Sequence, residues 1–438
     1  MTHDRADVAY TVGTLANGLR VVVAPSPSLH RAHVALHARV GSRFETSERN
    51  GISHFLEHMI YRGTKDLPSA HEVNYAFERH GGYLYAATHV DFGVFSLTLP
   101  PENLGVATQL FGDVLRGPEF HDIDIEKGIV CEEILEDLDD EGRQIDADNL
   151  SRSLVYPHHA LGYTITGDEA RVRSFDVPAL REHHARHYTA KNSVLAFGGA
   201  VDPDTAMALA ERAFGRLPSG EVTKAVAPVH TQKKPRILVV DNTSSQTELR
   251  LSFRALPASA PERHALDLMM RIVDDGMSTR LYHRVCDEKG LCYDVSAGYD
   301  GYEDDGIVDF AAGVQHARTS VVAREILELM TELATIGPTE EELAKAKRRQ
   351  LWDMGAMRDS SEEFASYYAH GLLFGRLEPL EERKEALARV TTREVRDVAA
   401  LLARPERLNV VAVGLLEDGE DRRLADVAKG WKGAATTG

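Results

Sequence analysis

The stretch Gly51-Ile52-Ser53-His54-Phe55-Leu56-Glu57-His58 places two histidines and a glutamate in one short, largely apolar segment. If this segment is helical, His54 and His58 lie at i and i+4 on one face, so both imidazoles can reach one cation. Glu57, three residues after His54, shares that face. Two imidazoles suit zinc, and a catalytic zinc takes a third protein ligand plus an open position for water. The segment therefore predicts part of a catalytic zinc site.

The five-residue pattern is weak evidence when it is taken alone, because the chain contains 20 histidines. Chance would produce such a pattern in roughly a tenth of comparable sequences. A pair of helix histidines beside a surface glutamate is the alternative interpretation. The residues around the motif have to decide between the two.

Strand and helix signals alternate around the motif. Asn17-Gly18 between two apolar runs predicts a β-hairpin, and the alternating apolar residues of 34–40 predict a strand with one buried face. Ser69 with Glu72 three residues later is typical of a helix N-cap. Further along the chain we expect strands over 83–87 and 92–99, and helices over 103–115 and 123–139.

The chain also contains a candidate linker and a repeated order of elements. Residues 217–235 have no sustained periodicity and several prolines, so we expect a linker there. Beyond it the order of strands and helices repeats, beginning with a strand over 236–240 and a helix over 263–273. The sequence thus predicts an α+β fold of two homologous domains, 1–216 and 236–438, each of mixed sheet plus helices.

Composition limits the classes of partner. The formal net charge of −18 disfavours nucleic acid and anionic membranes. Three cysteines, Cys131, Cys286 and Cys292, are too few for a disulfide framework and indicate a reducing compartment. The first ten residues show no apolar signal segment, and no apolar run approaches membrane-spanning length. We therefore expect a cytoplasmic protein that binds neither nucleic acid nor membranes.

The pattern His54-x-x-Glu57-His58 is the inverted zinc motif of the pitrilysin-like peptidases, or inverzincins. The flanking residues 51–59 and 63–65 resemble the processing-peptidase branch of that family in its single-chain bacterial form, and the resemblance covers nearly the whole chain. It implies a zinc metalloendopeptidase whose two domains close like a clam around oligopeptides or unfolded segments. In that family the two histidines bind Zn²⁺ and Glu57 would be the general base.

The resemblance also implies a third zinc ligand, a glutamate some 75 positions after His58. Glu132 and Glu133 compete for this role. The family's other functional glutamate stands seven residues before the ligand, and seven residues are about two helical turns. Glu126 and Glu133 fit that spacing, so we expect Glu133 to bind zinc and Glu126 to support the catalytic site from behind the ligands.

Two segments resemble the family's substrate-binding elements. Residues 81–88 match a strand that binds extended substrate backbone by β-addition, so pairing through Ala86 is expected. Tyr85 stands where the family usually has asparagine. In the second half, Tyr293 fits a tyrosine that grips substrate. The arginine that belongs seven residues before this tyrosine is replaced by Cys286.

The missing arginine leaves two interpretations open. Arg280 or Arg284 could reach the same place, although on a helix Arg284 would point about 200° away from Cys286. Alternatively, the chain is the zinc-bearing subunit of a heteromer, and a homologous zinc-less subunit supplies the arginine. We expect a dimer, either of two copies or with such a partner.

Other interpretations of the chain have to be weighed. His183, His184 and His187 have the spacing of a second metal site, but no matching carboxylate cluster follows them. A non-catalytic structural or assembly subunit of the same family is a further alternative, against which the intact zinc motif argues. A zinc hydrolase that acts on non-peptide amides is the third.

Overall fold

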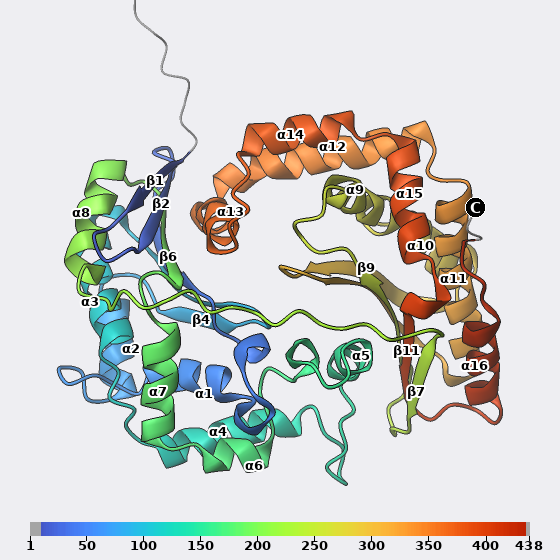
Figure 1. The fold of residues 1–438 in the computed structure, drawn as a ribbon, viewed down its shortest axis with the longest axis horizontal. Coiled ribbons are helices and arrows are strands. Elements are labelled where there is room, and N and C mark those ends of the chain that lie inside the picture. Colours follow the sequence, from blue (N-terminus) through green and yellow to red (C-terminus); the bar gives the residue numbers. More distant parts are fainter. Residues whose placement is uncertain (1–9, 435–438) are drawn as a thin grey trace, which may run out of the picture. The chain divides into compact units, whose positions relative to one another are not determined.

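The computed structural model describes residues 10–434, which form two compact units (Figure 1). The first unit comprises the chain up to Ile134, Tyr163–Ala225 and Gly355–Glu378, and the second comprises the segments between and after these. Residues 1–9, in which we expected no signal segment, lie outside the described range. Within that range, no helix has the length and apolar character needed to cross a membrane.

The first unit is built on a six-stranded mixed sheet with the strand order β1-β2-β6-β3-β5-β4. The expected hairpin at Asn17-Gly18 is confirmed, because Thr14 pairs with Arg20 and Gly18 adopts a φ of 94°. β2 and β6 run parallel, and the other neighbours are antiparallel. The strands are β1 (Thr11–Thr14), β2 (Arg20–Pro25), β3 (Ala32–Ala38), β4 (Tyr85–Thr88), β5 (Gly93–Leu99) and β6 (Ser193–Gly199).

Helices cover both faces of this sheet, since every residue of β3 and β6 is buried. α13 packs on β2, β3 and β6, whereas α3 contacts β3 and α8 contacts β2. The helices of the unit are α1 (Ile52–Ile60), α2 (Ala70–Glu78), α3 (Leu104–Arg116), α4 (Ile123–Leu135), α6 (Glu169–Ser174), α7 (Val177–His187), α8 (Pro203–Phe214) and α13 (Ser361–Leu373).

The second unit contains a five-stranded mixed sheet with the order β7-β11-β8-β10-β9. Its strands are β7 (Arg236–Val240), β8 (Thr247–Ala255), β9 (Cys292–Gly301), β10 (Gly306–Val314) and β11 (Leu408–Val413). Its helices are α5 (Ala147–Val155), α9 (Arg263–Val273), α10 (Arg280–Tyr282), α11 (Thr319–Thr335), α12 (Glu340–Ala356), α14 (Leu380–Arg389), α15 (Thr392–Leu402) and α16 (Glu420–Gly430). The expected helix over 263–273 is thus present with those bounds.

Each unit takes one helix from the opposite half of the sequence. α13 follows the second sheet's strands β7–β10 in sequence but packs in the first unit, and α5 precedes them but packs on β8 and β11 (Figure 1). The contiguous ranges 1–216 and 236–438 that we expected therefore differ from the compact units. Periodicity finds helices but does not say which sheet a helix covers.

Local signals are accurate at the start of one helix and fail at the end of another. The side chain of Ser69 accepts a hydrogen bond from the N–H of Glu72, so the expected N-cap is confirmed. The expected helix over 123–139 ends earlier, at Leu135. Asp139 accepts hydrogen bonds from the N–H groups of Glu141 and Arg143, and this turn replaces the last helical residues.

Candidate metal centre

The N-terminus of α1 is fixed by a buried carboxylate. Gly51 adopts a left-handed conformation with φ 94°, and a Cβ there would lie 2.6 Å from the carbonyl oxygen of Thr166, so only glycine fits. Glu45 accepts hydrogen bonds of 2.8 Å from the N–H groups of both Gly51 and Ser53. These bonds satisfy N–H groups that have no partner inside the helix, and they hold α1 in place.

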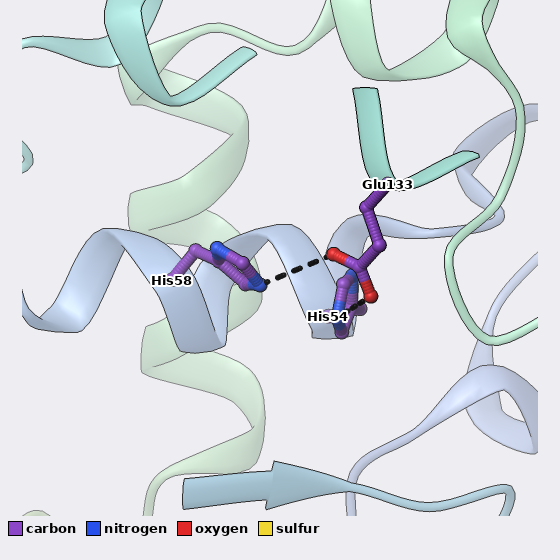
Figure 2. Close-up of side chains that lie close together, drawn as sticks. All are labelled: His54, His58 and Glu133. Atoms are coloured by element: carbon purple, nitrogen blue, oxygen red, sulfur yellow. Dashed lines mark ion pairs between the residues drawn. The ribbon is translucent and has the colours of Figure 1, made fainter. Parts of the chain in front are cut away.

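Two histidines of α1 and one glutamate of α4 come together in the first unit, as Figure 2 shows. Nε2 of His54 lies 3.4 Å from Oε1 of Glu133, and Nε2 of His58 lies 3.6 Å from Oε2 of Glu133. Among residues 10–434, these three form the one group of histidine, cysteine or acidic side chains placed to share a metal ion.

The spacing and chemistry of the three donors fit a zinc ion. Ligands at the bond lengths of tetrahedral zinc, roughly 2.0–2.1 Å, stand about 3.3–3.4 Å from one another. The distances of 3.4 and 3.6 Å from Glu133 to the two imidazoles lie close to that value and are long for charge-assisted hydrogen bonds. Two nitrogens and one carboxylate oxygen are also the donor types that zinc accepts.

His58 is oriented by a second carboxylate. Its Nδ1 lies 2.8 Å from Oε1 of Glu126. Because an ionised carboxylate can only accept, Nδ1 carries a proton, and Nε2 is the nitrogen that faces Glu133. Arg62 donates to the other oxygen of Glu126. Burial alone would raise the pKa of Glu126, but the hydrogen bonds from His58 and Arg62 hold it below its ordinary value.

His54 is the more deeply buried of the two histidines, with 8% of its surface exposed. Burial, aided by the nearby His58, lowers the pKa of His54 to about 3, so its ring is neutral at physiological pH. A neutral imidazole is the form that binds metals. Unlike His58, it has a buried Nδ1 without a hydrogen-bond partner in the described part of the chain.

Glu57 lies on the same helix and is held by the last residue of β4. Thr88 donates a hydrogen bond of 2.5 Å from its hydroxyl to Oε2 of Glu57. Burial raises the pKa of Glu57, although the hydrogen bond from Thr88 acts in the opposite direction. A carboxylate with a raised pKa near a candidate metal site is a stronger proton acceptor than an ordinary glutamate.

The other expected site residues lie in different surroundings. Glu132 is exposed, whereas Glu126 is buried on the same helix. Ala86 lies in β4, the last strand of the six-stranded sheet, and the side chain of the preceding Tyr85 is exposed. Tyr293 belongs to β9 in the second unit, and 92% of its surface is exposed.

The three histidines near the end of α7 make separate structural contacts. Nε2 of His183 lies 3.0 Å from the hydroxyl of Ser53 and so supports α1. Nε2 of His184 lies 2.8 Å from the carbonyl oxygen of Leu115, and Nδ1 of His187 lies 3.1 Å from that of Arg39. Each ring therefore has its own hydrogen-bond partner.

Cys286 stands where the family has a substrate-binding arginine, called here the clamp arginine. Both arginines that could replace it are held by glutamates of their own unit. Arg280 binds Glu342 through two hydrogen bonds of 2.6 and 2.7 Å. Arg284 donates a hydrogen bond of 2.6 Å to Glu332. Cys286 lies two residues beyond Arg284, about half a helical turn away, in a short π-helical segment, His283–Glu288.

Sequence reasoning missed Glu45, Arg62 and Thr88, which hold the functional side chains in place. Glu45 precedes α1 by several residues, and only the folded loop brings its carboxylate to the helix terminus. Thr88 reaches Glu57 through the placement of β4 beside α1. Arg62, one turn after His58, offered a usable signal, because side chains at i and i+4 share a helix face.

Comparison with known proteins gives consistent results along the chain. A family model described as Insulinase (Peptidase family M16) matches residues 20–169, and one described as Peptidase M16 inactive domain matches residues 174–350. An uncharacterized zinc protease of Bacillus subtilis is 30% identical over 396 residues, which cover 89% of this chain and 94% of that protein. One of Mycobacterium tuberculosis is 30% identical over 396 residues, with coverages of 88% and 89%.

Solved structures share the fold at lower identity. A protease from Helicobacter pylori has a TM-score of 0.86 and 22% identity, and the match covers 93% of this chain and 99% of that one. A peptidase M16 inactive domain from Pseudomonas fluorescens has a TM-score of 0.85 and 21% identity, with coverages of 93% and 98%. These matches confirm the expected α+β fold of two domains.

Proposed function

Because the chain belongs to peptidase family M16, the insulinase family, as the resemblance implied, we propose that it is a zinc-dependent endopeptidase. In this proposal His54, His58 and Glu133 bind the metal, and Glu57 is the general base. The observation that carries it is the convergence of the three donor atoms, each within 4.8 Å of the others. The non-catalytic alternative is disfavoured, since a structural subunit has no need of this donor set.

The protein's own groups prepare the site for hydrolysis. Zinc, when bound, acidifies a water molecule and polarises the scissile carbonyl. Glu126 holds His58 in the tautomer whose Nε2 can bind metal, and burial keeps His54 neutral. Glu57 takes the proton of the attacking water and passes it to the leaving amine, a role for which its raised pKa is suited.

The proposed substrate is an extended peptide, either an oligopeptide or an unfolded segment. β4 is the last strand of its sheet and carries Thr88, which holds Glu57. A peptide that pairs with β4 through the backbone of Ala86 would run beside the proposed base. Tyr293 is proposed as a second peptide contact because its ring is exposed.

The ligand assignment is tested by two matched variants of α4. Glu133→Gln removes a proposed ligand charge, whereas Glu132→Gln changes the adjacent, exposed carboxylate. We expect Glu133→Gln to lose most of the bound zinc together with the cleavage of an unstructured peptide, and Glu132→Gln to retain both. Equal zinc content and equal turnover in the two variants would exclude Glu133 as a ligand.

We also propose that the chain acts as the zinc-bearing subunit of a dimer, with a homologous zinc-less chain that supplies the clamp arginine. Support comes from Cys286 at the arginine position and from the glutamates that already hold Arg280 and Arg284. The purified chain alone should then cleave peptide slowly, and addition of the partner or the change Cys286→Arg should raise the rate severalfold. Rapid turnover by the isolated chain would refute this arrangement if neither the partner nor the change Cys286→Arg raised it further.

A further inference from the structure

Two of the three cysteines lie in contact in the second unit, whereas the proposed metal-binding residues belong to the first. Sγ of Cys286 lies 3.6 Å from Sγ of Cys292. Both side chains are partly exposed, whereas Cys131 is buried in α4 with 5% of its surface exposed. A disulfide bond is roughly 2.0 Å long, so the two sulfurs need to approach by about 1.5 Å to bond.

The backbone between the two cysteines can accommodate that approach. Cys286 lies in the π-helical segment, and the turn after it is closed by hydrogen bonds from Gly290 N–H to the carbonyl of Cys286 and from Leu291 N–H to that of Val285. Residues 287–290 are exposed, and a Cβ on Gly290 would have no neighbour within 4 Å. Packing therefore opposes little of the movement.

Cys292 itself lies where strand pairing is irregular. Regular pairing of β9 with β10 runs from Gly301 to Val295, and the register then shifts before Cys292 pairs with Val314. The backbone at an irregular strand end is displaced more easily than the backbone in the middle of a regularly hydrogen-bonded strand pair. Both ends of the connection can thus shift without disrupting the sheet.

We propose that Cys286 and Cys292 form a reversible disulfide, a redox modification site beside the exposed Tyr293. The oxidant is a low-molecular-weight disulfide such as oxidised glutathione. Like other disulfides in reducing compartments, the bond would be transient and would report the thiol–disulfide balance. This inference does not depend on the proposed peptidase activity.

The exchange proceeds in two balanced steps. Burial raises the pKa of Cys292 to about 12, and it raises that of Cys286 too, although the S–H of Cys292 acts against it there. Cys286 is therefore the first to act: its thiolate attacks one sulfur of oxidised glutathione and releases one glutathione molecule. The thiolate of Cys292 then attacks the Cys286 sulfur and releases the second. Two electrons and two protons pass from the cysteines to two glutathione thiols.

The cross-link also has a consequence for substrate binding, and this part rests on the proposed function. Tyr293 directly follows Cys292, so the disulfide restrains the backbone of the proposed peptide contact. The proposed metal ligands belong to the other unit, so the disulfide does not restrain the backbone that carries them. We therefore expect the oxidised enzyme to show a severalfold higher KM for peptide at an unchanged kcat.

The disulfide is tested on the full-length, reduced wild-type chain incubated with oxidised glutathione. We expect the loss of two of the three thiols that the chain contains, with a mass lower by two hydrogen atoms and full reversal by dithiothreitol. Trypsin cuts after Arg284, Lys289 and Arg318, so the disulfide should join the peptides 285–289 and 290–318. This product is identified directly in the wild-type protein.

Matched variants distinguish an internal disulfide between Cys286 and Cys292 from the separate reaction of single cysteines with glutathione. Cys131→Ala should still lose two thiols, whereas Cys286→Ser and Cys292→Ser should form no internal disulfide and at most a glutathione adduct. Three persistent thiols in the wild type, under conditions that oxidise dithiothreitol, would overturn the proposal. So would two stable glutathione adducts, or a disulfide between chains. Because the measurement counts thiols, its failure would leave the proposed peptidase function untouched.

Discussion

Nδ1 of His58 lies 2.8 Å from Oε1 of Glu126, in a carboxylate that also accepts from Arg62. This contact fixes the tautomer and the direction of the ring, so the opposite nitrogen faces Glu133. His54 has no comparable contact, because its Nδ1 is buried without a partner within residues 10–434. The two proposed ligands are thus held by different means, one by a hydrogen bond and the other by packing.

The change Glu126→Gln tests the oriented ligand. The amide can still accept from Nδ1, but it lacks the negative charge that makes the imidazole a better donor to the metal and that pairs with Arg62. We expect zinc affinity to fall by roughly 10–100-fold, as is usual when such a partner is changed. Competition with a chromophoric chelator measures this, with Glu132→Gln as the control on the same helix. Unchanged affinity would mean that Glu126 has only a structural role.

The change Glu57→Gln tests the proposed base. Glutamine has nearly the same shape and can keep the hydrogen bond from Thr88, but it cannot take a proton. We expect the zinc content of the wild type together with a loss of at least about 100-fold in kcat, the usual scale of a general base. Near-normal turnover in a fully zinc-loaded variant would show that another group accepts the proton.

The sequence predicts the site better than it predicts the partition of the chain. A short motif predicts that His54, Glu57 and His58 share one helix face, and the helical spacing from Glu126 favours Glu133 over the adjacent Glu132 as the third proposed ligand. The exchange of α5 and α13 between the units escaped prediction, because amphipathic periodicity is the same whichever sheet a helix covers. Glu45 and Thr88 escaped it too, because loop and strand placement bring them to the site.

The close approach of α13 to β6 can be tested at Gly198. A Cβ at this position would lie 2.1 Å from the carbonyl oxygen of Ser361, so Gly198→Ala forces the helix and the strand apart. We expect the free energy of unfolding to fall by about 2–3 kcal/mol, as in other overpacked cores. Gly355→Ala is the control, because a Cβ there meets nothing within 4 Å in α12 and should stabilise by roughly 1 kcal/mol. Equal effects in urea unfolding would refute this packing.

Buried histidines beneath α13 should make stability depend on pH. Burial, with smaller effects from His370, His33 and His89, lowers the pKa of His37 to about 3 from an ordinary value of 6.5. Below about pH 6.5, His37 is protonated in the unfolded chain, whereas in the folded chain it stays neutral until the pH approaches 3. Stability is therefore full above about pH 6.5 and is lost as the pH falls toward 3, by about 1.4 kcal/mol per pH unit for this group.

His37→Leu isolates this contribution. The variant removes the titrating ring from β3, so its free energy of unfolding should fall less steeply between pH 6.5 and 4.5 than that of the wild type. Urea unfolding is measured with a chelator present, so that metal release does not contribute. Parallel curves for the two proteins would show that His37 has the same pKa in the folded chain as in the unfolded chain.

The central claim is that one zinc ion, held by His54, His58 and Glu133, makes the chain a peptidase. Its most direct test titrates zinc back into the metal-stripped wild-type chain while the cleavage of an unstructured fluorogenic peptide is followed. We predict negligible cleavage without metal and a rate that rises in proportion to zinc and levels off at one ion per chain. Full cleavage by the stripped chain, or no cleavage once one zinc ion per chain is bound, would contradict the claim.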